Sequence, residues 1–434
     1  TTAGNNTAIG YAALEANTTG TRLVAIGMNA LNANTTAGNN TAIGYGALKV
    51  NTAANNTAVG KDAMIANTTG STNVAIGVDA LTTNTTGSSN TAVGTGAMED
   101  NTTASYNTAC GQDALHANTT GAEHVAVGSR ALQANTTGAD NTALGFSALK
   151  VSTTGSYLTA VGGNALIKNT TASYNTAIGY DCMVENTTGA QNTAIGGYAL
   201  DANTTASNNT AVGYNALTDC ATGTRNTAVG VLALGNVTAD DCTAVGYEAA
   251  VETTSAGGQV AVGRGCLNKN ETGGENTVMG YHARRFGTTH RGTTIIGYEA
   301  AQGVNGQNSG ADWNVAVGYV ALKAVTTGTH NVGVGASALT AVTTGGQNVS
   351  MGTRALGSNA TGSNNTAIGH YAMRDNTANL GGTAVGAWAL TTNSTGSSNT
   401  AVGYSALIEN STGSSNIAVG HQALDANTTG SQLV

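Results

Sequence analysis

Proline is absent from this sequence, and aromatic and charged side chains are scarce. Only 4% of the 434 residues are aromatic and 9% are charged. A globular domain of this length would bury many large side chains to offset the entropy lost on folding, so these shortages exclude a conventional hydrophobic core. Any burial must come from small and β-branched residues that pack in a regular way.

Several functional classes are disfavoured by what is missing. The formal net charge of −8 argues against a nucleic-acid partner, which would need a basic surface. No run of 18 apolar residues is present, so we expect no membrane insertion. Five cysteines do not make a disulfide scaffold. No nucleophile stands beside a candidate base and the His residues are scattered, so we expect neither an enzyme, nor a metal site, nor a cofactor.

The sequence contains a repeat of about 17 residues. A composition dominated by a few residue types makes such internal repetition the first feature to look for. We number its positions 1 to 17 from Asn6, so that Ile9 is at position 4, Gly10 at position 5 and Asn17 at position 12. About 25 copies fill residues 1–434 as one continuous array. Two steps are shorter by a single residue, near 44–60 and 230–246, and one holds an insertion near 302–313. No cap is visible, and we expect the chain to be part of a longer one.

A few positions of the repeat are tightly restricted. Position 5 is Gly in all 25 copies, position 4 is always apolar, and position 8 is Ala in 23 copies and Cys in two. Position 9 is usually Leu or Met. The invariant Gly predicts a corner with positive φ or a close approach of two backbones. The structural positions are represented by Asn6, Ile9, Gly10, Ala13, Leu14, Asn17, Gly27 and Gly44.

The repeat predicts an all-β fold. Asn-Thr-Ala-Val-Gly is typical of a short strand, and Ala-Leu-x-x-Asn, which is too short for a stable helix, predicts a second one. Thr-Thr-Gly-Ser is typical of a turn. Two strands and two turns in each copy predict one coil of a β-solenoid, or β-roll. Coils would lie about 4.8 Å apart, and the Asn at positions 1 and 12 would form ladders of stacked amides.

Both sides of the predicted strands are restricted, although neighbours along a strand point to opposite faces. We interpret position 4 as the core of the coil, and the Ala positions as a face kept small because another chain packs on it. This interpretation favours a homo-oligomer, most simply a homotrimer, with lateral or end-to-end assembly. The alternative is a narrow monomeric coil whose tight cross-section demands Ala.

The motif Asn-Thr-Ala-Ile-Gly-Tyr-x-Ala-Leu-x-x-Asn-Thr-Thr-Gly-Ser resembles the repeats of phage tail-fibre proteins and of secreted tail-fibre-domain proteins of bacteria. The Val-Ala-Ile-Gly segments at 24–27 and 74–77 are also similar, more distantly, to the head repeats of trimeric autotransporter adhesins. The resemblance covers essentially the whole chain. It implies a trimeric β-roll or β-solenoid, extracellular on a cell surface or virion, that serves as a shaft or adhesive stalk.

One cluster of basic and aromatic residues interrupts the repeat next to the insertion. It is a candidate contact for an acidic glycan or another partner, or else a degenerate coil with a solvated basic face. Tyr recurs at position 6, where it would cover the coil edge or bind sugars. The residues of the cluster are His282, Arg284, Arg285, His290, Arg291 and Trp313.

The cysteines and the Asn-Thr-Thr segments suggest further sites. Cys220 and Cys242 replace Asn residues of the repeat, and a disulfide between them is conceivable. Cys110, Cys182 and Cys266 are at predicted core positions, where free thiols would be buried. Asn-Thr-Thr is a formal N-glycosylation acceptor, although the repeat also needs Asn and Thr for ladders and turns. The acceptors include Asn17, Asn34, Asn67 and Asn84.

These observations favour a structural extracellular fibre or filament shaft built by self-association. An adhesin or receptor-binding stalk that contacts surface glycans is the alternative. An ice-binding solenoid is a third hypothesis, but it needs flat ranks of Thr. Val interrupts the strand Thr at Val24, Val74, Val125 and Val332.

Overall fold

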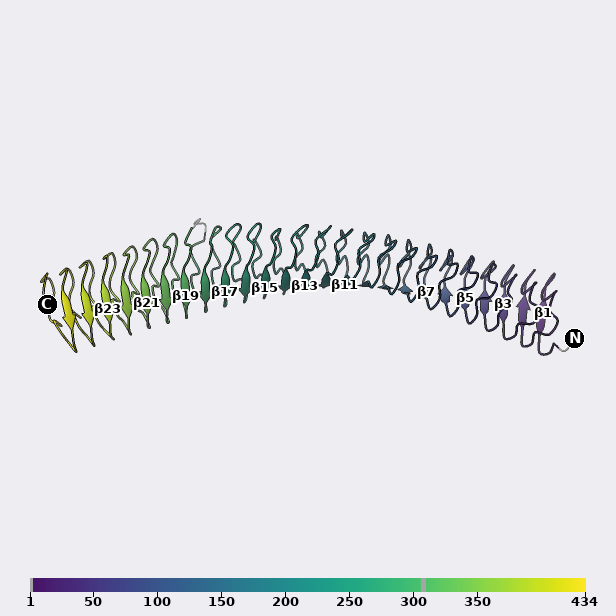
Figure 1. The fold of residues 1–434 in the computed structure, drawn as a ribbon, viewed down its shortest axis with the longest axis horizontal. Helices are drawn as coiled ribbons and strands as arrows, with labels where there is room; N and C mark the ends of the chain where they lie inside the picture. Colours follow the sequence, from purple (N-terminus) through teal and green to yellow (C-terminus); the bar gives the residue numbers. More distant parts are fainter. Residues whose placement is uncertain (1–2, 306–309) are drawn as a thin grey trace. The chain divides into compact units, whose positions relative to one another are not determined.

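Successive copies of the repeat form parallel strands in the computed structural model, which describes residues 3–305 and 310–434. The chain divides into two compact units, Thr1–Thr222 and Gly223–Val434. Each unit is a parallel β-solenoid in which every copy contributes one strand of three residues (Figure 1). The predicted all-β solenoid with a repeat of about 17 residues is therefore confirmed.

Unit 1 carries the strands β1 to β13, and each pairs in parallel with the next one in the chain. The central Ala of one strand lies opposite the central Ala of the next, as Ala92 does opposite Ala109. The strands are β1 (Thr7–Ile9), β2 (Val24–Ile26), β3 (Thr41–Ile43), β4 (Thr57–Val59), β5 (Val74–Ile76), β6 (Thr91–Val93), β7 (Thr108–Cys110), β8 (Val125–Val127), β9 (Thr142–Leu144), β10 (Thr159–Val161), β11 (Thr176–Ile178), β12 (Thr193–Ile195) and β13 (Thr210–Val212).

Unit 2 repeats this arrangement with β14 to β25. Its register is kept across the long insertion, because Ile295 of β18 lies opposite Ala316 of β19. The strands are β14 (Thr227–Val229), β15 (Thr243–Val245), β16 (Val260–Val262), β17 (Thr277–Met279), β18 (Thr294–Ile296), β19 (Val315–Val317), β20 (Val332–Val334), β21 (Val349–Met351), β22 (Thr366–Ile368), β23 (Thr383–Val385), β24 (Thr400–Val402) and β25 (Ile417–Val419).

Each strand ends at the invariant Gly, which turns the chain. The φ angle of Gly10 is 129°, in the region that a side chain rarely adopts. A Cβ on Gly10 would lie 2.7 Å from the carbonyl carbon of Gly27 in the next coil. Both physical reasons predicted for this Gly, positive φ and close backbone approach, are confirmed.

The second strand predicted for each copy is wrong. Residues 11–16 of the first copy form a turn, closed by a hydrogen bond from the N–H of Asn17 to the carbonyl of Leu14 (3.2 Å). Leu14 has a φ of 55°, and this left-handed conformation breaks the alternation of a strand. The turn still bonds to the next coil, since Leu14 N–H donates to Ala30 O (3.1 Å). It therefore extends the ladder of coils without being a strand.

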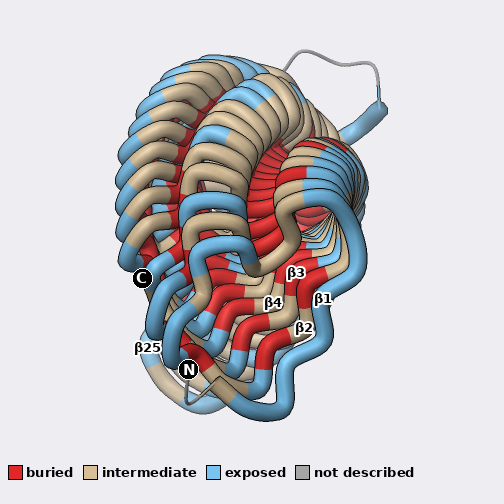
Figure 2. Tube along the Cα trace, turned by 90° about the vertical axis from the view of Figure 1, so that its right-hand side faces the viewer, coloured by how far each residue is buried: buried red, intermediate tan, exposed pale blue. Residues whose placement is uncertain are grey.

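The core of each unit is narrow, and small residues fill it. Positions 3, 8 and 9 are fully buried in one copy as Ala92, Ala97 and Met98, and buried positions recur at the same place in successive coils (Figure 2). Position 4, predicted to be the core, points outward instead: Ile76 is 42% exposed and Leu144 47%. Because strand neighbours alternate, an inward position 3 places positions 2 and 4 outside. The narrow cross-section explains the Ala, and the predicted outer Ala face is wrong.

Candidate interaction surfaces

Two rows of Asn run inside the coils, and they form different hydrogen bonds. At position 12 the amides bond to one another: Asn101 Nδ2 donates to Asn84 Oδ1 (2.9 Å), and Asn84 Nδ2 donates to Asn67 Oδ1 (2.7 Å). The predicted amide ladder is confirmed there. At position 1 the side chain bonds mostly to the main chain, as Asn6 Oδ1 accepts from the N–H of Leu23 (3.0 Å). Amides also bond to one another there in three adjacent copies, at Asn331, Asn348 and Asn365. The two rows satisfy most of the polar groups in the small core, although the buried Oδ1 atoms of Asn34, Asn135 and Asn203 accept no hydrogen bond.

The predicted glycosylation acceptors belong to this same ladder. Asn34, Asn67 and Asn84 are fully buried, whereas Asn17 in the first copy is half-buried. A glycan on a buried Nδ2 would replace the hydrogen bonds to the neighbouring amide and to a main-chain carbonyl. The folded chain therefore offers no access to a glycan at the three buried positions.

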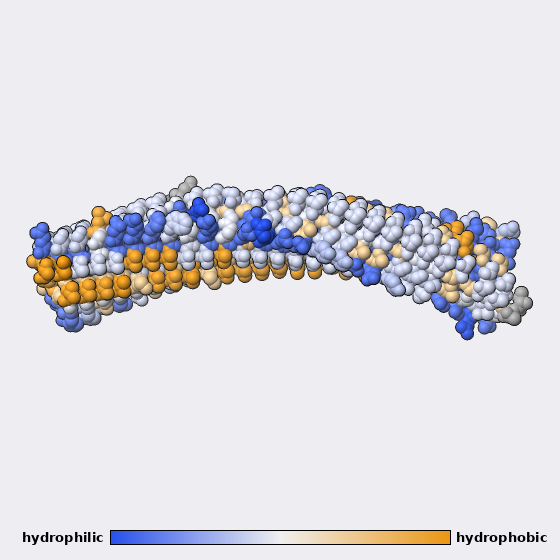
Figure 3. Space-filling view, in the orientation of Figure 1, coloured by the Kyte–Doolittle hydropathy of each residue, from blue (hydrophilic) through white to orange (hydrophobic). Residues whose placement is uncertain are grey.

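The outward positions 2 and 4 form a surface that we call the strand face. Position 2 is Thr, Val or Ile, and position 4 is Ile, Val, Leu, Met or Cys. None of these positions is charged in any of the 25 copies, although 9% of the chain is charged. Part of the strand face is visible as an orange band over the strands of unit 2 (Figure 3). The most exposed position-4 residues are Ile9, Ile76, Leu144, Met279, Met351 and Val419.

The strand face is large for an uncovered apolar surface. A fully exposed aliphatic side chain presents roughly 100 Å², so a row of twelve or thirteen at about one-third exposure presents on the order of 400 Å² per unit. That equals the largest apolar patch of a typical monomer, about 300–600 Å², before the Thr and Val of position 2 are added. Sequence reasoning missed this surface because a row without charges is equally typical of a buried strand.

The cluster predicted as a partner contact is split between the inside and the surface of its coils. Arg284 and His290 are buried and hydrogen-bond to each other. Arg291 is outside, with Nη2 3.2 Å from Oε1 of Glu275. Arg284 occupies position 9, which Leu or Met fills in the core of other copies, so its guanidinium lies inside. The prediction of one exposed basic surface is wrong.

Arg284 stabilises the insertion from within. Its guanidinium donates to the main-chain oxygens of Ala301 (3.4 Å), just before the insertion, and of Ala311 (3.3 Å), near its end. Burial lowers the pKa of Arg284 to about 9 and that of His290 to about 2. Residues 306–309 of the predicted insertion lie outside the described residues.

The remaining members of the cluster pair with nearby aromatic groups. The ring of His282 lies against Tyr281, with centroids 3.9 Å apart, and the guanidinium of Arg285 is 5.2 Å from the ring of Phe286. Trp313 is 49% exposed. These contacts are local to each coil and do not converge on one site.

All five cysteines lie within the described residues and none forms a disulfide, so the disulfide considered between Cys220 and Cys242 is not formed. Each of these two thiols occupies an Asn row of its own coil, and Cys242 donates to a main-chain carbonyl (3.3 Å). Burial raises the pKa of Cys182 and Cys266 to about 12, which agrees with the buried thiols predicted there. Cys110 is at the outward position 4 and is exposed, so the burial predicted for this thiol is wrong.

Tyr at position 6 is exposed and, in several copies, stacks on its neighbour in the next coil. The ring centroids of Tyr281 and Tyr298 are 5.1 Å apart, and those of Tyr298 and Tyr319 are 5.4 Å apart, with nearly parallel planes. Stacked rings cover each other's faces and direct their edges and hydroxyls outward. This short ladder covers the coil edge, and both faces of its middle ring, Tyr298, are covered by its neighbours.

Within residues 3–305 and 310–434, no three His, Cys, Asp or Glu side chains come close enough to hold a metal ion, and no helix is long and apolar enough to span a bilayer. No protein-family model matches the chain, and no curated protein matches its sequence significantly.

Proposed function

We propose that this protein is a structural shaft of an extracellular fibre, and that copies of the chain associate side by side through the strand face. The observation that carries the proposal is an exposed, apolar face without a single charge along each unit. With its Thr and Val row included, that face approaches the roughly 800 Å² that each partner contributes to a standard interface. The resemblance to tail-fibre and adhesin repeats supports the extracellular location and a trimeric assembly.

A second copy of the chain is the partner that fits this face best. Strands in each copy repeat about every 4.8 Å, so the rows of one copy can interdigitate with the rows of another at every coil. Interfaces between identical sheets pack in this dry, regular way. A partner without the same spacing would match the face at only a few coils.

Sedimentation equilibrium of the full chain tests the proposal. We expect a multiple of the 42.6 kDa monomer mass at concentrations of about 1–100 μM. The variant Ile76→Lys, Val93→Lys, Val127→Lys places three charges on the strand face and should dissociate the assembly. The control variant Thr72→Lys, Ser89→Lys, Tyr106→Lys adds the same charge at position 17, an exposed row that already carries Arg22 and Glu123.

A wild-type chain that stays monomeric over this range would overturn the proposal, as would equal dissociation of both variants.

Ice binding is the second candidate, because the outward Thr of β9 to β13 form an unbroken row, from Thr142 to Thr210. A monomeric chain with measurable thermal hysteresis would favour that function over the shaft.

A further inference from the structure

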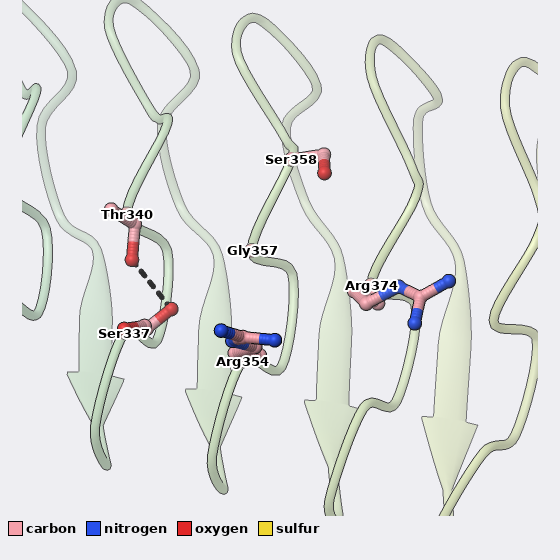
Figure 4. A pocket seen from close by; sticks show the side chains of 6 residues that line it. All are labelled: Ser337, Thr340, Arg354, Gly357, Ser358 and Arg374. Atoms are coloured by element: carbon pink, nitrogen blue, oxygen red, sulfur yellow. Dashed lines mark hydrogen bonds between the residues drawn. The ribbon is translucent and has the colours of Figure 1, made fainter.

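A pocket of about 310 Å³ lies on unit 2, away from the strand face, between three successive coils (Figure 4). Gly357 helps to open it, because position 10 carries a larger side chain in most other copies, such as Ile65. The volume is at the lower end of the range for small-ligand sites, about 300–1,000 Å³. The lining residues are Ser337, Thr340, Arg354, Gly357, Ser358 and Arg374.

The pocket carries one uncompensated positive charge. Arg374 is paired with Asp375 through two hydrogen bonds of 2.8 and 2.6 Å. Arg354 has no carboxylate within ion-pair distance among the residues that the structure describes. The sequence from 324 to 374 contains no Asp or Glu, in a chain with an overall charge of −8. This local excess of positive charge favours one anionic group.

Neighbouring aromatic rings hold the Arg354 guanidinium in place. Nη1 donates to the hydroxyl of Tyr371 (3.0 Å), and the guanidinium carbon is 5.7 Å from the centre of that ring. The Tyr371 ring stacks on Trp388, with centroids 4.6 Å apart. One of the five guanidinium donors is thus used for positioning, and the others remain for a planar oxyanion.

Three hydroxyl groups line the same pocket as the Arg354 guanidinium. Thr340 Oγ1 donates to the main-chain oxygen of Ser337 (2.6 Å), so its lone pairs can accept from a ligand hydroxyl. The side chains of Ser337 and Ser358 line the same pocket. One fixed cation beside several hydroxyls matches a ligand that has one carboxylate and several hydroxyls of its own.

We propose that this pocket binds an acidic sugar unit, with its carboxylate on Arg354 and its hydroxyls on Ser337, Thr340 and Ser358. The proposal goes beyond the shaft function and does not depend on self-association. It gives the fibre a surface site for a uronic-acid type of saccharide. A free sulfate ion offers similar anionic chemistry without the sugar hydroxyls, and the experiment separates the two.

Isothermal titration of the full chain with glucuronate at low salt tests this site. We expect saturable binding with a Kd of about 0.1–5 mM, weaker binding of acetate and inorganic sulfate, and none of glucose. Arg354→Gln should weaken glucuronate binding by about tenfold or more, since it removes a charge-assisted hydrogen-bond donor. Arg130→Gln is the matched control, because Arg130 is exposed at the same repeat position in unit 1.

A second variant removes the pocket without removing the charge. Gly357→Ile introduces the side chain that position 10 already carries at Ile65, and it should weaken glucuronate binding by about tenfold while the far-ultraviolet spectrum is unchanged. Absence of glucuronate binding up to about 20 mM, or an unchanged affinity in Arg354→Gln, would overturn the proposal. Equal affinities for acetate, sulfate and glucuronate would reduce the pocket to a simple anion site and refute the sugar assignment.

Discussion

At the scale of single residues, side-chain size decides how each coil is filled. Most copies combine Ala at position 3 with Leu or Met at position 9. In one copy the sizes are exchanged: position 3 is Ile295 and position 9 is Ala301, and both are fully buried. Because tight packing tolerates swaps that conserve volume, this exchange keeps the interior of that coil filled.

A second feature at this scale is His124, which replaces Asn in the buried row at position 1. Its Nδ1 accepts from the N–H of Asn141 (3.2 Å), and burial lowers its pKa to about 4. Between pH 6.5 and 4 the unfolded chain therefore binds a proton that the folded chain does not, so stability falls as the pH falls through this window. Above it, the imidazole is neutral in both states and has no such effect.

We expect His124→Asn to remove this pH dependence. The wild type should lose about 2 kcal/mol at pH 4.5 relative to pH 7.5 through this group, and the variant should not. Urea unfolding of both proteins at the two pH values measures the difference, and carboxylates that titrate nearby cancel in the comparison. An equal loss in both proteins would contradict the assignment.

At the scale of elements, the Asn ladder connects one turn of the coil to the next. The row is not polar throughout, because Val325 and Val342 take position 12 in two adjacent copies and are fully buried. Two adjacent apolar residues are tolerated there because they face each other. Among the described residues, no amide is left opposite them without a hydrogen-bond partner. Removal of one amide from a bonded pair should therefore cost more than removal of both, because the remaining polar atom loses its partner.

Such pairing predicts a coupled effect at two ladder positions. Asn84→Val removes the donor to Asn67 Oδ1 and should cost about 2–3 kcal/mol. In the double variant, Asn67→Val removes the oxygen that Asn84→Val leaves without a donor. It also removes one donor to the oxygen of Asn51, but that oxygen keeps its bond from Asn56 (3.2 Å). The double variant should then cost about 1 kcal/mol less than the sum of the single ones. Additive losses in urea unfolding would show that the two amides act independently.

At the scale of the whole molecule, each unit is quasi-one-dimensional. A strand pairs only with the strands of the copies before and after it, as β6 does with β5 and β7. In such repeat structures stability is the sum of coil terms and contacts between adjacent coils. One complete coil is therefore dispensable, whereas a fraction of a coil is not.

Deletion of residues 91–107 tests this property in unit 1. It joins Asn90 at position 1 to Thr108 at position 2, so every row stays continuous. We expect an unchanged far-ultraviolet spectrum and a melting temperature within about 5 °C of the wild type. Deletion of 91–98 removes about half a coil and should unfold the chain locally. If both deletions melted alike, the coil would not be the structural unit.

The sequence by itself determined the period, the Gly corner and the amide row at position 12. Each of these depends on residues repeated at one position. The Gly is needed because the backbone is too crowded for a Cβ, and the Asn is needed because each amide stacks on its copy in the next coil. The all-β class follows from them, because so short a repeat with two turns leaves room only for short extended segments.

Only the tertiary structure decided which rows face inward. A strand with restricted residues on both faces gives the same sequence pattern whichever face points inward. The left-handed turn at Leu14 determines which face of the strand points inward, but its local sequence is typical of a strand. The same turn places Arg284 inside the coil and Ile76 outside it. The apolar face and the Arg354 pocket are therefore products of the fold, since both are formed by side chains that only neighbouring coils bring together.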